Sequence, residues 1–159
     1  MCDNGTGAIF WGRRRCGLGT LNMMETIKVI HKEDVVLVKV GTFYTAYGKD
    51  AYIINYMFNY KLNKTQDVYT SAFPISSLAK VTAILEKNKI NYIVLDRRNN
   101  YDVEQQVDNK NLNRYGKFLE LAKVKVRKNK RIEEILECLK DDEELIEEVE
   151  KLIYERRKI

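Results

Sequence analysis

Short β-type runs alternate with stretches of helical spacing over the first two thirds of the chain. The run "VVLVKV" at 35–40 is β-branched and ends at Gly41, which predicts a buried strand. "DVYTSAF", ended by Pro74, and "INYIVLD" at 90–96 predict two more strands. Helical spacing between the strands is carried by Ala51, Ile54, Met57, Phe58 and Leu62, and then by Leu78, Val81, Ile84 and Leu85. The strand–helix–strand–helix–strand order predicts an α/β (α+β) fold, a mixed β-sheet flanked by helices.

The carboxyl-terminal third has a helical pattern throughout. A polar, Asn-rich connector follows Asp96, and apolar residues then keep helical spacing from Leu112 to Val126 and again over 132–139. A third helix is expected to begin at a capping pair of Asp141 with Glu144. The narrow apolar stripes and dense charge of the last helices are typical of a helical hairpin or a partner-binding stalk.

The first 23 residues differ from the rest of the chain. They hold five of the eight glycines and the only tryptophan, without periodicity. Three arginines, Arg13 to Arg15, follow the short apolar piece, which is the wrong order for a secretory signal. We predict a disordered leader over 1–23, with a nucleic-acid-binding arm built on the arginines as the alternative. The predicted domains are this leader, an α/β domain over 24–110 and a helical extension over 111–159.

Composition places the chain among globular proteins. Of its 159 residues, 45% are hydrophobic and 32% charged, and no apolar run reaches the length of about 18 residues that a membrane-spanning helix needs. Cys2, Cys16 and Cys138 lack metal-ligand spacing and indicate free thiols in a reducing, cytoplasmic setting. Cys138 lies on an apolar helical face and is expected in the core. The single histidine, His31, is expected at the surface.

Charge is distributed unevenly. Residues 35–131 hold 18 Lys/Arg against 8 Asp/Glu, whereas residues 132–159 hold 5 against 11. The basic part is suited to phosphate, and the acidic part to a solvated helix or a docking surface.

No catalytic motif emerges. The chain lacks a phosphate-binding loop, and its early glycines precede no strand–helix unit of a dinucleotide-binding fold. Asp96, Asp102, Glu104 and Asp108 suggest a nuclease-type metal cluster only weakly, and a polar surface connector is the alternative. We predict a protein that is not an enzyme and uses no cofactor.

The stretch "VGTFYTAYGKDA" is interpreted as a loop after the first strand, and it combines aromatic residues with glycine and charge. Phe43, Tyr44 and Tyr47 offer flat faces on which bases stack, or wedges that enter a base step, although an aromatic residue in such a place is more often part of the core. Charge alone marks four candidate phosphate contacts: Lys39, Lys49, Arg97 and Arg98.

This arrangement resembles the amino-terminal mismatch-recognition domain of the MutS family. That family reads approximately G-x-F-Y-E-x-F/Y and then D-A, and here Gly41, Phe43-Tyr44, Tyr47 and Asp50-Ala51 stand between a strand and a helix. The similarity continues through "AFPISSLAKVTAILEKNKINYIVLD", so it spans about 35–96. It leaves no room in this chain for the connector, lever, clamp and ATPase domains of the family.

The resemblance implies roles for individual residues. Phe43 matches the phenylalanine that wedges beside a mispaired base, and Thr45 stands where the family has a glutamate that hydrogen-bonds the displaced base. A threonine hydroxyl is shorter and uncharged, so the same base contact is not implied. The leading hypothesis is a non-enzymatic module for mispaired or distorted nucleic acid, with DNA preferred. The alternative is an accessory subunit that docks a repair or polymerase-type enzyme through the acidic helices after Ile132.

Overall fold

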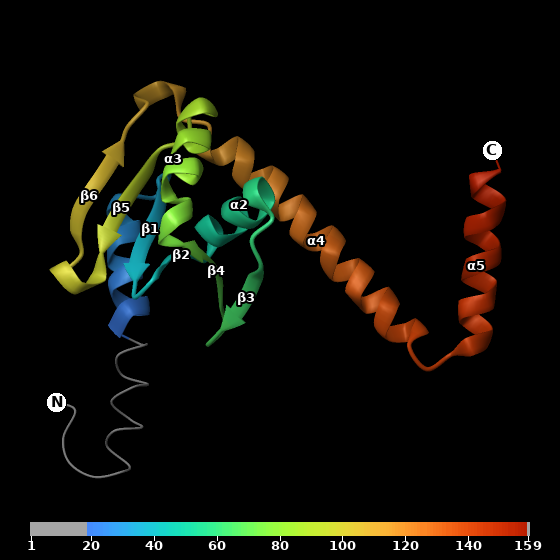
Figure 1. Ribbon diagram of the computed structural model, residues 1–159. Helices are drawn as coiled ribbons and strands as arrows, with labels where there is room; N and C mark the ends of the chain where they lie inside the picture. The colour runs from blue at the N-terminus through green and yellow to red at the C-terminus, as the bar shows by residue number, and fades with distance from the viewer. Residues whose placement is uncertain (1–18, 159) are drawn as a thin grey trace, which may run out of the picture.

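The computed structural model describes residues 19–158, and its centre is one six-stranded sheet (Figure 1). The strand order is β3-β4-β2-β1-β5-β6. β1 and β5 are parallel, and each other neighbouring pair is antiparallel, so the expected mixed sheet is confirmed. The strands are β1 Val35–Val40, β2 Phe43–Tyr47, β3 Leu62–Thr65, β4 Val68–Pro74, β5 Tyr92–Asp96 and β6 Asp102–Val107.

Helices cover both faces of the sheet. The amino-terminal helix (residues 19–30) lies on one face, and α2 (Lys49–Phe58), α3 (Leu78–Lys87) and the start of α4 (Tyr115–Leu139) lie on the other. α4 then runs away from the sheet, and α5 (Glu143–Arg157) turns back beside it at a distance (Figure 1). Three short 3₁₀ turns complete the chain: η1 Ile75–Ser77, η2 Arg97–Asn99 and η3 Lys110–Leu112. We call residues 19–122 the sheet domain.

The central strand β1 is buried on both faces, which explains its unbroken apolar sequence. Val35 and Leu37 belong to the larger core under α2, α3 and α4, whereas Val36 and Val38 belong to a smaller core under the amino-terminal helix. Met24 anchors that helix, with 3% of its surface exposed. Successive side chains of a strand point to opposite faces, so one run supplies two cores.

Three strands lie where the sequence predicted none. β2 falls in the stretch interpreted as a loop, and β3 begins at Leu62, which was assigned to a helix. The helix α2 instead ends at Phe58, because Asn59 adopts a left-handed conformation with φ of 57°. β6 lies inside the polar connector as the edge strand beside β5, and its side chains are exposed up to Gln106, so no buried face marked it.

The carboxyl-terminal helices also differ from the prediction. The two helices expected over 112–126 and 132–139 form one continuous helix, α4, since no Pro or Gly interrupts the basic stretch between them. Asp142 rather than Asp141 caps α5, because its side chain accepts a hydrogen bond from the Leu145 amide at 3.0 Å. The prediction of Cys138 in the core is wrong: it is exposed, on a part of α4 that lies beyond the sheet domain.

The predicted boundary at Met24 lies within the amino-terminal helix, which extends from residue 19. Most of the predicted leader, including Arg13 to Arg15, lies outside the described residues. His31 is half-buried and its ring contacts Asp34 at 2.7 Å.

Within residues 19–158, no helix combines the length and the apolar character needed to cross a bilayer.

Candidate nucleic-acid interface

β2 separates the aromatic residues of the "TFYTAYG" stretch onto two faces of the sheet. Phe43 is 48% exposed, whereas Tyr44 is 3% exposed. Thr45 and Tyr47 alternate with Tyr44 and Ala46, so they share the face of Phe43. Phe43 is thus the most exposed aromatic side chain of this stretch.

A tight turn holds Phe43 in place. Gly41 has a φ of +64°, which favours glycine, and the chain reverses there so that Phe43 pairs with Val40. The Ile75 amide donates to the Thr42 carbonyl at 3.2 Å and fixes this turn against the end of β4. The ring is therefore presented from a strand end that is hydrogen-bonded on both sides.

Tyr44 has the packing role that the sequence left open for it. Its ring stacks on Phe73 at 5.9 Å, and its hydroxyl donates to Glu104 Oε2 at 3.2 Å. Burial, together with the Glu104 carboxylate, raises the pKa of Tyr44 to about 12. Tyr44 therefore stabilises the strand from which Phe43 projects.

Thr45 lines a polar hollow on the same face as Phe43. The hollow has a volume of about 270 Å³ and brings Thr45 near Gln66, Thr70 and Arg97. Gln66 occupies the two-residue turn between β3 and β4, where it and Asp67 have φ of 50° and 62°. Neither Gln66 nor Thr70 was predicted as a site residue. β3 was not expected, and the turn after it brings residues near Thr45 that are distant from it in the sequence.

The predicted phosphate contacts divide between the two ends of the sheet. Arg97, Arg98 and Lys39 lie at the end that carries Phe43, because the parallel strands β1 and β5 both finish there. Lys39 points to the opposite face and lies 4.0 Å from Asp96. Lys49 stands beyond the far end of β2, at the start of α2.

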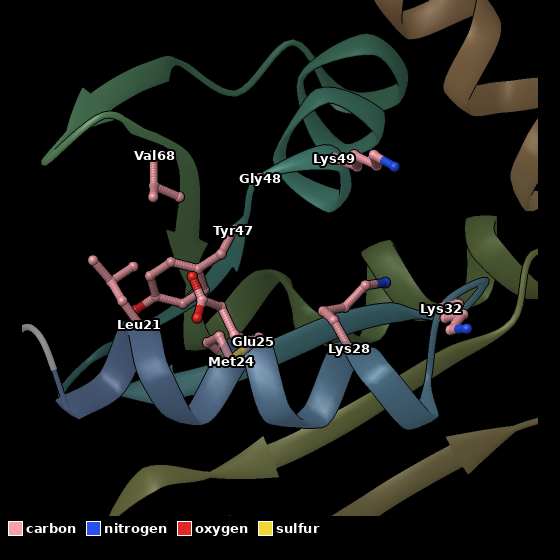
Figure 2. Close-up of a pocket in the computed structure, with 9 residues that line it drawn as sticks. All are labelled: Leu21, Met24, Glu25, Lys28, Lys32, Tyr47, Gly48, Lys49 and Val68. Atoms are coloured by element: carbon pink, nitrogen blue, oxygen red, sulfur yellow. The ribbon is translucent and has the colours of Figure 1, made fainter.

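Lys49 belongs to a second, larger pocket between the amino-terminal helix and α2. The pocket has a volume of about 450 Å³, and Lys28 and Lys32 also line it. Figure 2 shows the three lysines gathered at one end and Tyr47 with its apolar neighbours at the other. Lys28 lies in the last turn of the amino-terminal helix and Lys32 in the turn that follows it. Neither lysine was predicted from the sequence, because no helix was expected over 19–30.

A buried carboxylate ties this pocket to the core. Asp50 is fully buried and accepts hydrogen bonds from Lys28 Nζ at 3.0 Å, from the Tyr115 hydroxyl at 2.7 Å and from the Val36 amide at 3.1 Å. Burial raises the pKa of Asp50, and Lys28 and the hydrogen bonds oppose that shift. The aspartate thereby connects the amino-terminal helix, β1, α2 and α4.

The four carboxylates considered as a metal cluster have separate contacts. Asp96 accepts from the Arg98 amide, Glu104 from Tyr44, and Asp108 from Asn91 and the Lys110 amide, while Asp102 lies opposite Asp96 in the sheet. No group of three or more His, Cys, Asp or Glu side chains that could hold a metal ion lies in the described part of the chain.

One family matches this architecture at the sequence level. The profile of the family described as MutS domain I matches residues 19–116, which is more than half of the 159-residue chain. The matched range starts in the amino-terminal helix and ends at the beginning of α4, so it includes the whole sheet and both pockets. No curated protein matches the chain.

Proposed function

The chain belongs to the MutS domain I family, a DNA-binding module for mismatch recognition, and we propose that it binds mispaired or distorted DNA by inserting Phe43 into the base stack. The observation that carries the proposal is the exposure of Phe43, at 48%, beside a fully packed Tyr44. Aromatic wedges of this kind unstack a base step and kink the duplex. The proposed role is binding without catalysis.

Rigid presentation supports a wedge. Hydrogen bonds on both sides of β2 and the Thr42–Ile75 contact fix the backbone of Phe43 before DNA arrives. A ring held in this way loses little conformational freedom on binding, so more of its stacking energy is available for affinity. Arg97 and Arg98 follow β5 at the same end of the sheet as Phe43, and we propose that they contact phosphates near the distorted step, while Lys49 contacts DNA farther along.

Thr45 sets the expected specificity. Thr45 lines the polar hollow with Gln66, Thr70 and Arg97, and no carboxylate among residues 19–158 lines that hollow. Because the family carries a glutamate at this position, we propose that the module prefers distorted over regular duplex while discriminating weakly between individual mismatches. Thr45→Glu is then expected to increase the preference for mismatched over matched duplex.

The test is a set of binding curves by fluorescence anisotropy. Matched duplex, mismatched duplex, single-stranded DNA and a double-stranded RNA are compared at 50 and 200 mM salt. With about three phosphate contacts, the slope of log K against log salt is expected to be about −3 on duplex DNA. The paired variant Arg97→Gln/Arg98→Gln is expected to flatten that slope by about 2.

The contradicting results are equally specific. Affinity that does not change between the two salt concentrations rejects the phosphate contacts. Equal affinity for matched and mismatched duplex, in the wild type and in Thr45→Glu alike, rejects recognition of distorted DNA. Lys87→Gln serves as the control for charge, because Lys87 is an exposed lysine at the end of α3, on the face of the sheet opposite to Phe43.

A further inference from the structure

The outer part of α4 and all of α5, residues 123–158, leave their apolar side chains largely uncovered. We call this segment the α4–α5 hairpin. Every residue from 127 to 138 is exposed, and in α5 only Leu145, Ile146 and Val149 are half-buried. Helices of this length are marginal in water without tertiary packing of an apolar face. The large apolar side chains that remain exposed are Val124, Ile132, Ile135, Leu136, Leu152 and Ile153.

The charges of the hairpin are sorted into four blocks. Residues 123–131 hold six Lys/Arg and no acid, and residues 132–139 hold three Glu and no base. In α5, residues 143–150 hold five Glu and no base, whereas residues 151–158 hold four Lys/Arg and one Glu. The order along the chain is therefore basic, acidic, acidic, basic.

This order opposes closure of the hairpin on itself. If α5 folded back along α4, the acidic block 143–150 would lie beside the acidic block 132–139, and the two basic blocks would also meet. Like charges on facing helices are destabilising. The structure agrees with this argument, because α5 stands apart from α4 beyond the connecting turn (Figure 1). The ion pairs Lys130–Glu134 and Lys140–Glu137 join residues of the α4 end only one turn apart.

A second copy of the chain in antiparallel orientation brings blocks of opposite charge together. Each basic block of α4 then faces the acidic block of the partner's α4. Ile132, Ile135 and Leu136 lie against the aliphatic stems of the arginine and lysine side chains in the basic block of the partner subunit, and Leu139 faces Val124. We infer that the outer part of α4, residues 123–139, is a self-association surface on which a second copy of this chain docks antiparallel, with a two-fold axis near the junction of residues 131 and 132. Such an interface is isologous and closes as a dimer.

Because this segment lies outside the matched range 19–116, the inference is independent of the proposed DNA binding. The proposed partner is a second copy of the same chain. The charge sequence is self-complementary only when one copy is inverted, and a parallel copy would place like blocks together over the whole length.

The first test measures the mass of the full chain by sedimentation equilibrium over about 1–200 µM. The expected result is a dimer with twice the 18.7 kDa mass of one chain. Leu136→Lys is expected to abolish the dimer, because it places a lysine against the basic block of the partner subunit, and because Leu136 is 60% exposed the variant keeps its circular-dichroism spectrum and melting temperature. Val103→Lys is the matched control, since Val103 is 54% exposed on the edge strand β6 and lies outside the hairpin. A wild-type monomer at every concentration overturns the inference, as does equal loss of the dimer in both variants.

The second test reverses the charges. Arg127→Glu/Lys128→Glu/Lys130→Glu/Arg131→Glu makes the block 123–131 net acidic, and Glu133→Lys/Glu134→Lys/Glu137→Lys makes the block 132–139 basic. Each set is expected to weaken dimerisation at least tenfold, because two blocks of like net charge then face each other. A variant carrying all seven changes restores opposite net charges, so its dimer is expected to return to within about threefold of the wild type. Single-block variants that dimerise as well as the wild type overturn the inference.

The third test measures orientation through the exposed thiol of Cys138, with Cys2 and Cys16 changed to Ser. In the antiparallel dimer the two Cys138 residues lie roughly 20 Å apart along the helix axis, so oxidation is expected to yield no disulfide-linked dimer. A parallel dimer would place them side by side. Rapid cross-linking through Cys138 would therefore overturn the antiparallel arrangement.

Discussion

The sheet domain and the α4–α5 hairpin both carry strong apolar patterns, yet they use them in opposite ways. In the sheet domain, residues such as Leu37, Phe73 and Leu85 are fully buried, and the buried carboxylate of Asp50 has three hydrogen-bond partners. In the hairpin, Leu136 and Leu152 are 60% and 52% exposed. The stability of the sheet domain therefore comes from contacts within the chain, whereas the apolar surface of the hairpin is available for contacts with another molecule.

The difference also separates two kinds of exposed apolar residue. Phe43 is exposed on a backbone that the sheet holds rigidly, which suits insertion into a base stack. The hairpin residues are exposed in a stripe flanked by charge, which suits a broad helix–helix interface. Substitutions in the two regions should therefore affect different measurements.

The largest expected effect compares a core leucine with a hairpin leucine. Leu85→Ala, in α3 and fully buried, is expected to lower the free energy of unfolding by about 2–5 kcal/mol, because it removes packing and leaves a cavity. Leu152→Ala is expected to change it by less than about 0.5 kcal/mol at a dilution where the chain is monomeric. Urea denaturation measures both. Similar losses in the two variants would show that the hairpin is as tightly packed as the domain.

The next effect compares a buried ion pair with an exposed one. Lys28→Met leaves the Asp50 carboxylate buried without its cation, and about 2–3 kcal/mol of stability should be lost at pH 7.5, allowing for the partial exposure of Lys28. Lys130→Met removes the exposed pair with Glu134 in the hairpin and should cost less than about 0.5 kcal/mol.

The pH dependence of Lys28→Met gives a second check. Burial raises the pKa of Asp50, and without Lys28 the pKa rises further, so the folded state binds a proton more tightly than the unfolded state does. Stability relative to the wild type should therefore improve as the pH falls from 7.5 to 5. A deficit that stays constant or grows at pH 5 would exclude an unpaired Asp50 as its cause.

A smaller effect is expected at alkaline pH. The pKa of Tyr44 is raised to about 12, so above pH 10 the unfolded chain loses this proton before the folded chain does and stability falls. Tyr44→Phe should reduce the loss between pH 10 and 11 by about 1 kcal/mol. Tyr154→Phe, at an exposed hairpin position, should leave it unchanged. Denaturation curves at pH 8, 10 and 11 measure this loss of stability in each variant. Identical pH profiles for the two variants would contradict the buried role of Tyr44.

Much of the fold could be predicted from the sequence, and two of the three missed strands share one cause. The strands β1, β4 and β5 and the helices α2 and α3 bury a face, so their apolar spacing was visible. β3 and β6 have almost fully exposed side chains, and a strand without a buried face leaves no periodic signal. Exposed and buried residues alternate along β2 as expected for a strand, but the glycines at both of its ends favoured the interpretation as a loop.

The site was predictable only in part, because it is assembled from segments far apart in the chain. Phe43 was one of three aromatic candidates in the local sequence, and the family resemblance distinguished it as a wedge and identified Thr45. The separation of Phe43 from Tyr44 depends on which face of β2 each occupies, and the hollow around Thr45 depends on the turn at Gln66 and on Arg97 after β5. Lys28 and Lys32 required the amino-terminal helix to be placed against α2.

The most direct test of the account is Phe43→Ala, measured at once for binding to a mismatched duplex and for thermal stability. We predict a loss of about 1–3 kcal/mol in binding, roughly 5- to 150-fold in affinity, because the variant removes the stacking ring. We expect little change in melting temperature, because Phe43 is nearly half exposed. Unchanged affinity would show that Phe43 does not contact DNA. A large fall in melting temperature together with lost binding would show that the ring supports the fold instead.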